Sequence, residues 1–444
     1  MPAAGEIDNG RVSTPGSSIF PAFAPVRMDF PRERVADVRR EAAAAVGAAL
    51  AAADLAPGAT VAVTAGSRGI ADIQAITRAI VDRVRELGHL PFIVPAMGSH
   101  GGATSEGQRA LLARYGITEA TMGCAIRAEM EATPLGVTDQ GVGTYMARVA
   151  WEADAVLIVN RVKPHTDFLG VRESGLTKML AIGLGKLEGA QACHQHVFDI
   201  GLGPAITSAA SHILKTGKIA GGIAIIENAY HEVARIVFVP PSGFLDREAE
   251  LLLEARRLMG RLPLDEIDVL VCDRMGKNIS GQGLDTKIIG RSPFGYVQGQ
   301  PWQPGMPLIR RIVVRDLTPE TDGNAMGMGL IDIVPERFTR KVNVATTLIN
   351  SVTAMTPENA KTPHVVPNDE EAIALALRML PPRDGGPRMV YVRDTLELSD
   401  SLVSDAGLPL IRDRPQASIV GPPRPLRFDA ERNLISPFED PPAA

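Results

Sequence analysis

The side chains best suited to chemistry lie in one stretch, NRVKPHTDFLGVRESGLTKMLAIGLGK at residues 160–186, and in two histidines beyond it, His194 and His196. His165 follows a proline just after an apolar run, so the backbone is restrained where this side chain leaves the buried segment. Lys178 stands among almost uncharged neighbours, a setting in which a lysine tends to be a nucleophile or to bind an anion. We therefore expect a functional site in this stretch.

Two earlier loops carry further candidates. Arg68 lies in GSRG and His100 lies in GSHGGAT, and each loop directly follows a short apolar run with the composition of a buried strand. Ligands in open α/β sheets bind beyond the carboxyl ends of strands. If these strand ends lie side by side with the one before His165, then Arg68, His100 and His165 line one cleft.

A third polar loop occurs in the second half of the chain. The sequence MGKNISGQGLDTKIIGR, residues 275–291, follows the apolar run IDVLVC and is dense in glycines and polar groups. Its side chains could bind a carboxylate or hydroxyl groups, although a solvated loop is an equal interpretation. The residues concerned are Lys277, Asn278, Ser280 and Gln282.

A metal ligand is also possible, because neutral imidazole binds nickel, zinc or copper. His194 and His196 would share one side of an extended segment but would face different sides of a helix. Their spacing alone is a weak metal signal. Cys193 beside them fits a small buried residue better than a thiolate ligand.

Composition narrows the class of protein. The 444 residues are 45% hydrophobic and 22% charged, with 46 basic and 51 acidic side chains and a formal charge of -5, which gives no general attraction to nucleic acid or membrane. The three cysteines form no C-x-x-C pair, which favours a reducing compartment. No apolar run reaches the ~20 residues of a membrane helix, and the polar N-terminus lacks a signal-peptide pattern. We expect a cytoplasmic protein.

Strand-like and helix-like segments alternate along the chain, which predicts an α/β fold of two α/β domains with mostly parallel sheets. We place a flexible tail at 1–18, an N-terminal domain at 19–262, a C-terminal domain at 263–420, and a second tail at 421–444. The expected strands cover residues 59–65, 91–97, 153–160, 221–228, 235–241, 267–273, 309–316 and 387–395. The expected helices cover residues 71–88, 106–116, 203–217, 246–261 and 335–352.

Taken in order, SRG, GSHGGAT, KPHTDFLGVRESGLTK and the later histidine resemble the nickel-dependent lactate racemase family, which comprises nickel-pincer nucleotide 2-hydroxyacid racemases and epimerases. The resemblance implies an isomerase that inverts C2 of a 2-hydroxy acid by reversible hydride transfer to the nickel-pincer nucleotide. It also implies an active-site cleft between the two domains, with 19–262 as the catalytic and cofactor-binding domain and 263–420 as the domain that closes the cleft. Separate biosynthetic enzymes would supply this cofactor. The small-molecule hydroxy acid would be the substrate.

The resemblance also implies roles for individual residues in the first domain. Lys178 resembles the lysine that joins the cofactor covalently, and His194 resembles the protein ligand to nickel. His100 and His165 resemble the two histidines that alternate as acid and base. Arg68 resembles the arginine that holds the substrate carboxylate.

Four further positions complete the expected site. Ser174 and Gly175, just before the lysine, are expected to contact the cofactor, because the glycine would let backbone N–H groups approach a phosphate. Lys277 and Asn278 lie where the second domain of the family contacts substrate.

The sequence departs from the family pattern in three ways. Ala65 stands where the family usually has an aspartate, and the interval from His165 to Lys178 is longer, with additional residues around 171–173. No clear match to the aromatic substrate contacts of lactate racemase is found. A larger or more polar substrate than lactate, a sugar acid such as gluconate, therefore fits better.

Two other functions remain open at this point. One is a zinc- or iron-dependent hydro-lyase or aldolase acting on sugar acids, with His165, His194 and His196 as metal ligands. The other is a non-catalytic protein that binds a nucleotide or a hydroxy acid.

Overall fold

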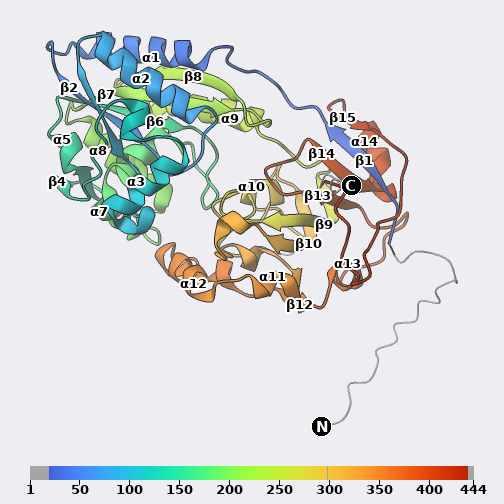
Figure 1. The fold of residues 1–444 in the computed structure, drawn as a ribbon. Coiled ribbons are helices and arrows are strands. Elements are labelled where there is room, and N and C mark those ends of the chain that lie inside the picture. Colours follow the sequence, from blue (N-terminus) through green and yellow to red (C-terminus); the bar gives the residue numbers. More distant parts are fainter. Residues whose placement is uncertain (1–19, 298, 439–444) are drawn as a thin grey trace.

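Two sheets with helices packed against them organise the chain (Figure 1). The computed structural model describes residues 20–297 and 299–438. The N-terminal tail expected at 1–18 lies outside the described residues. Most strand pairs in both large sheets are parallel, as expected from the alternation of segments, so the predicted α/β class is confirmed.

The first large sheet has five strands in the order β3-β2-β6-β7-β8, and only β7 and β8 pair in antiparallel fashion. Four of these strands, β2, β3, β6 and β7, are short apolar runs buried over most of their length, whereas β8 at one edge is only partly buried. The bounds are β2 (Thr60–Ala65), β3 (Leu90–Pro95), β6 (Ala155–Arg161), β7 (Ile219–Glu227) and β8 (Val233–Val239).

Helices cover both faces of this sheet. Alternate residues of a strand point to opposite faces, so Val61 and Leu157 join one core with α1 and α2, while Ala62 and Ile158 join another with α8 and α9. The bounds are α1 (Val38–Ala53), α2 (Ile73–Glu86), α8 (Leu202–Leu214) and α9 (Phe244–Leu258).

Shorter elements complete this half of the chain. They are α3 (Ser105–Arg114), α4 (Glu119–Met122), α5 (Arg148–Trp151), α6 (Leu176–Lys178), a π-helical turn (Met179–Gly183), α7 (Lys186–His194) and the hairpin of β4 (Ala132–Val137) and β5 (Gly143–Ala147).

The second large sheet has eight strands in the order β12-β11-β10-β9-β13-β14-β1-β15. The strands are β1 (Phe23–Met28), β9 (Glu266–Met275), β10 (Leu308–Leu317), β11 (Ile333–Pro335), β12 (His364–Val366), β13 (Met389–Val392), β14 (Asp400–Ser404) and β15 (Ala417–Ile419). The expected division at residue 262 assigns β1 to the first domain. In the structure, β1 pairs with β14 and β15 of the second sheet. The division at residue 262 does not separate the two sheets at this strand, since the partners of a strand can lie far along the chain.

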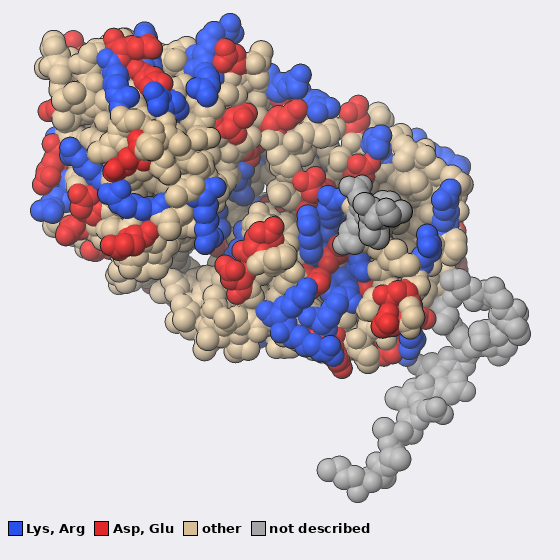
Figure 2. Space-filling model, viewed as in Figure 1, with Lys and Arg blue, Asp and Glu red and all other residues tan. Residues whose placement is uncertain are grey.

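The helices of this half are α10 (Thr286–Ile289), α11 (Glu336–Arg340), α12 (Val344–Thr353), α13 (Asp369–Arg378) and α14 (Leu408–Arg412). The single helix expected at 335–352 is therefore two, since Asn343 caps α12 by accepting the N–H of Thr346 at 3.1 Å. The outward side chains of α12 are apolar and exposed, notably Val344 and Ile349. Figure 2 shows an uncharged surface in the lower middle of the view, where α12 lies.

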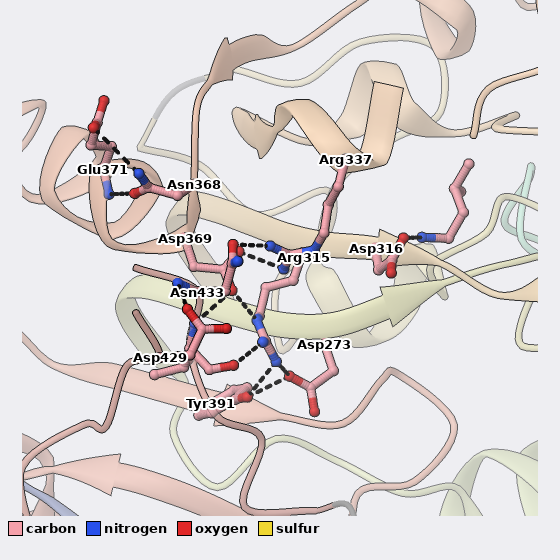
Figure 3. A network of polar contacts seen from close by, with 12 residues as sticks. Asp273, Arg315, Asp316, Arg337, Asn368, Asp369, Glu371, Tyr391, Asp429 and Asn433 are labelled. Atoms are coloured by element: carbon pink, nitrogen blue, oxygen red, sulfur yellow. Dashed lines mark hydrogen bonds and ion pairs between the residues drawn. The ribbon is translucent and has the colours of Figure 1, made fainter. Parts of the chain in front are cut away.

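A buried polar network ties the C-terminal segment to this sheet (Figure 3). Arg315 of β10 contacts Asp273 of β9 and donates to Asp369 at 2.8 Å and to the hydroxyl of Tyr391 at 2.9 Å. The same guanidinium donates to the carbonyl of Leu434, a residue that is 3% exposed. Part of the segment expected as a tail at 421–444 is therefore packed, up to residue 438.

Within residues 20–297 and 299–438, no helix combines the length and the apolar character needed to cross a membrane.

Candidate active site

Three parallel strands bring the predicted loops together. β3, β2 and β6 are neighbours, with Ala65 opposite Pro95 and Val63 opposite Leu157, so their carboxyl ends lie at one edge of the sheet. The loops that follow carry Arg68, His100 and His165. Because parallel neighbours end on the same side, this part of the expected arrangement follows from the strand order alone.

His100 lies in a cationic environment. Its Nδ1 is 2.5 Å from the hydroxyl oxygen of Ser67. Although part of the side chain remains exposed, burial by surrounding protein and the positive charges of Arg68, Lys178 and Lys277 lower its pKa to about 3. The structure thus brings four of the expected residues, from both halves of the chain, into one electrostatic group.

Two residues not singled out from the sequence hold the His100 loop. Lys186 is fully buried and donates from Nζ to the carbonyl of Pro95 at 2.8 Å and to Oε1 of Gln108 at 3.1 Å. The Nε2 of Gln108 donates to the carbonyls of Gly98 at 3.0 Å and His100 at 3.3 Å. Buried polar groups need such partners, and here they fix the backbone beneath a predicted catalytic residue.

His165 is buried, and its ring is held on three sides. The backbone N–H of Asp167 donates to Nδ1 at 2.9 Å, the ring of Phe168 stacks on the imidazole at 4.4 Å between centroids, and Nε2 contacts Nζ of Lys178. Since Nδ1 accepts, the neutral ring carries its proton on Nε2. Burial and the nearby positive charges of Lys178 and Lys287 hold the pKa of His165 well below its usual value.

Lys178 is an amine adapted to lose its proton. Burial and the charge of Arg68 lower its pKa to about 8, although the carboxylate of Asp167 acts in the opposite direction. The Nε2–H of His165 can donate only to a neutral Lys178 amine. A neutral amine is the nucleophilic form of lysine, so this side chain can form a covalent bond at ordinary pH.

A buried carboxylate supports the turn that carries Lys178. Oε2 of Glu248 accepts the backbone N–H of Thr177 at 2.7 Å and also contacts its hydroxyl. Oε1 of Glu248 lies so close to Gly175 that a Cβ there would be 2.0 Å away. The glycine is therefore required by packing against Glu248. Ser174 pairs through its backbone with Lys163, at 2.8 and 3.1 Å.

His194 and His196 differ in their surroundings. Nδ1–H of His194 donates to the carbonyl of Ala190 at 2.7 Å, which leaves a lone pair on Nε2, as a metal ligand requires. Its pKa is lowered by burial and by the charge of Lys178. His196 instead lies 3.6 Å from Asp199. Burial raises the pKa of the Cys193 thiol to about 12, so that group is inert.

In the part of the chain that the structure describes, no group of three or more His, Cys, Asp and Glu side chains is placed to hold a metal ion. The set of His165, His194 and His196 considered for zinc or iron is therefore not assembled.

Besides Lys287, the second half contributes Lys277 to the site. Burial and the charge of Arg68 lower the pKa of Lys277 to about 7, and its Nζ donates to the carbonyl of Gly281 at 2.6 Å. Asn278 is exposed, and its Oδ1 accepts the hydroxyl of Thr318 at 2.6 Å. The structure thus links Lys277, but not Asn278, to the other expected residues.

Asp167 was not assigned a role from the sequence, although it lies in the same motif as His165. Its carboxylate acts on Arg68, Lys178 and Lys277 alike. Its Oδ1 accepts from Nε2 of Gln282 in the second half at 2.6 Å. A carboxylate beside several basic residues in a sequence is usually a solvated partner, so only the fold shows its central position.

Residues 55–201 match the model of the lactate racemase N-terminal domain. This part of the chain is similar to a lactate racemase N-terminal domain. Arg68, His100, His165, Lys178 and His194 all lie within it. Within this part of the chain, the match supports a racemase-type function and the lactate racemase family expected from the motifs.

Two solved structures are similar to the chain at low sequence identity. The lactate racemase apoprotein from Thermoanaerobacterium thermosaccharolyticum is 13% identical, with a TM-score of 0.48, over 85% of this chain and 99% of that one. A protein from Thermotoga maritima is 14% identical, with a TM-score of 0.46, over 76% of this chain and 88% of that one. No curated protein matches the chain.

Proposed function

We propose that this protein is a racemase or epimerase that inverts C2 of a 2-hydroxy acid, lactate-like or a sugar acid such as gluconate. The cofactor would be a nickel-pincer nucleotide attached covalently to Lys178. The observation that carries the proposal is the grouping of a guanidinium, a readily neutralised amine and two imidazoles, in which Arg68 and Lys178 act on His100 while Lys178 contacts His165.

The residues present fit this cofactor. Lys178 offers an amine that loses its proton near pH 8, and His194 offers an imidazole whose Nε2 is free to bind nickel. When bound, the nucleotide supplies an acceptor for the C2 hydrogen as hydride, which avoids a dianion at a carbon bearing hydroxyl and carboxylate. The protein supplies position and charge.

Arg68 would bind the substrate carboxylate in a two-point grip and so orient C2. Lys277 would add a second positive charge from the other half of the chain. Binding of the anion would offset these two charges, which now depress the pKa of His100. The base would then strengthen when substrate is present, because an opposite charge favours the imidazolium.

The two histidines would handle the hydroxyl proton, one for each enantiomer. A lowered pKa keeps both rings neutral near pH 7, the form that accepts a proton. If Ser67 accepts from Nδ1–H of His100, the lone pair lies on Nε2 and faces away from that hydroxyl. In this structure the neutral ring of His165 carries its proton on Nε2 and accepts the N–H of Asp167 at Nδ1. To act as a base at Nε2, the ring must carry its proton on Nδ1 instead, and the N–H of Asp167 must move away from Nδ1.

The test uses cofactor-loaded protein and a panel of chiral 2-hydroxy acids from lactate to gluconate, each deuterated at C2, in ordinary water. The proposal expects inversion of at least one acid with the deuterium retained, because hydride returns to the same carbon. Washout of the label during inversion would indicate proton abstraction instead. Binding without turnover across the panel would support the non-catalytic alternative.

A further inference from the structure

The second half of the chain holds the loop that follows His165. Three consecutive loop residues each accept one hydrogen bond from the segment 282–287: the carbonyl of Thr166 from the hydroxyl of Thr286 at 2.5 Å, Oδ1 of Asp167 from Nε2 of Gln282 at 2.6 Å, and the carbonyl of Phe168 from Nζ of Lys287 at 2.8 Å. The donor side chains are buried. Such bonds are strong where water is excluded.

Two of these loop residues are the ones that hold the imidazole. The N–H of Asp167 donates to Nδ1 of His165, and the ring of Phe168 stacks on it. Displacing the backbone at 167 or 168 therefore displaces the groups that select the tautomer and the plane of the ring. The position of His165 depends on contacts made more than a hundred residues away in the sequence.

A second route starts from the same lysine. Nζ of Lys287 lies 3.8 Å from Oε2 of Glu173, and this oxygen accepts the backbone N–H of His165 at 2.6 Å. The ammonium is itself fixed over the ring of Trp302, 4.1 Å from its centroid. Lys287 thus supports the backbone on both sides of the imidazole.

Gln282 is equally well fixed on its own side. Its Oε1 accepts from Nδ2 of Asn359 at 3.1 Å. Its backbone carbonyl is packed against Gly327, where a Cβ would lie 1.8 Å away. The amide is therefore oriented before it reaches Asp167, and it has no freedom to turn toward a ligand without breaking a buried bond.

We propose that Gln282 and Lys287 are positioning residues for His165, through which the second half of the chain sets the tautomer and orientation of this histidine. The inference rests on the proposed acid–base role of His165. Gln282 was considered from the sequence as a direct contact to substrate; the geometry assigns it to Asp167 instead. Residues that act on a base alter kcat and leave KM nearly unchanged, whereas substrate contacts alter KM.

The test compares Gln282→Met and Lys287→Met with Lys287→Arg, which keeps a donor, and with Lys361→Met, an exposed lysine of the same half as the control. Full-length proteins are labelled with ¹⁵N at histidine, and the His165 ring signals are assigned by their loss in His165→Asn. In the native protein we expect one neutral tautomer protonated on Nε2.

In both methionine variants we expect the His165 ring signals to show mixed tautomers. We also expect kcat of the cofactor-loaded protein to fall roughly 10- to 100-fold with KM nearly unchanged, because the ring loses the plane set by Phe168 even though the N–H of Asp167 leaves Nδ1 more readily. Lys287→Arg should keep most of the native ring signals and most of the native kcat. Lys361→Met should change neither the ring signals nor kcat. Should Lys287→Met fail to fold, Gln282→Met, of nearly the same volume, tests the same point.

Unchanged ring signals in folded Gln282→Met would overturn the inference, and so would a rise in KM at native kcat. The ring signals are measured without cofactor or substrate. If no hydroxy acid is turned over but the signals still shift, the positioning is upheld and only the proposed function fails.

Discussion

Glu248 lies beneath the turn that carries Lys178, and replacing it with glutamine should make the stability of the protein less dependent on pH. This side chain is 1% exposed, and burial raises its pKa from 4.5 to about 7, against the opposing effect of its bonds to Thr177. Glutamine has nearly the same shape and keeps an oxygen that can accept the N–H of Thr177. The substitution therefore removes the titration and little else.

The raised pKa of Glu248 determines whether stability rises or falls with pH. A carboxyl group whose pKa is higher in the folded state favours folding fully below its unfolded value of 4.5 and loses that contribution as pH rises through about 7. At roughly 1.4 kcal/mol for each pH unit between the two values, the loss amounts to about 3 kcal/mol in total. About 2 kcal/mol of it falls between about pH 5.5 and pH 8.5.

Urea unfolding at several pH values measures this difference. Trp151 of α5 lies in the same half as Glu248, so its fluorescence in a Trp302→Phe background reports the relevant transition. From pH 5.5 to pH 8.5 the free energy of unfolding of the native protein should fall by about 2 kcal/mol more than that of Glu248→Gln. Glu250→Gln, an exposed carboxylate on the same helix, is the control and should keep the native slope. If the free energy of unfolding changes equally with pH in Glu248→Gln and in the native protein, the reasoning is refuted.

Three further outcomes follow from the site. His100→Ala and His165→Ala should retain the cofactor but lose racemisation by roughly 10²- to 10⁴-fold, and near-native turnover in either would remove that residue from the proposed chemistry. Lys178→Ala should lack the covalent adduct in an intact-mass measurement, and a persisting adduct would contradict the assignment. Lys186→Met leaves Oε1 of Gln108 and a backbone carbonyl without a donor, so urea unfolding should show a loss of about 2–4 kcal/mol; an unchanged midpoint would show that these bonds contribute little.

Much of the first half could be predicted because its signals are local. The apolar runs before Arg68, His100 and His165 became β2, β3 and β6, and helix endings at glycine or polar residues were close to those expected. Parallel strands of this kind end at one edge of a sheet, so these loops were expected to meet if the strands were neighbours, and the sheet order β3-β2-β6 makes them neighbours. The match to the lactate racemase N-terminal domain covers this same region.

Other features depended on contacts between distant segments. The apolar pattern of β1 predicts a strand but not its partners, and the structure pairs it with β14 and β15 near the other end of the chain. The apolar periodicity of the run 335–352 predicts one helix. The structure divides it, because the side chain of Asn343 accepts a backbone N–H and so caps the start of α12, an interaction that apolar periodicity does not reveal.

By itself, the sequence determined which residue types stand at the ends of the strands, since a strand and the loop after it are specified by a few neighbouring residues. The tertiary structure alone decided which charged groups are buried and what they touch. Lys186 reads as a solvated lysine and is fully buried, and Asp167 reads as a loop carboxylate and is bound by Gln282. The pKa and hydrogen bonds of such groups depend on every atom packed around them, and those atoms come from all parts of the chain.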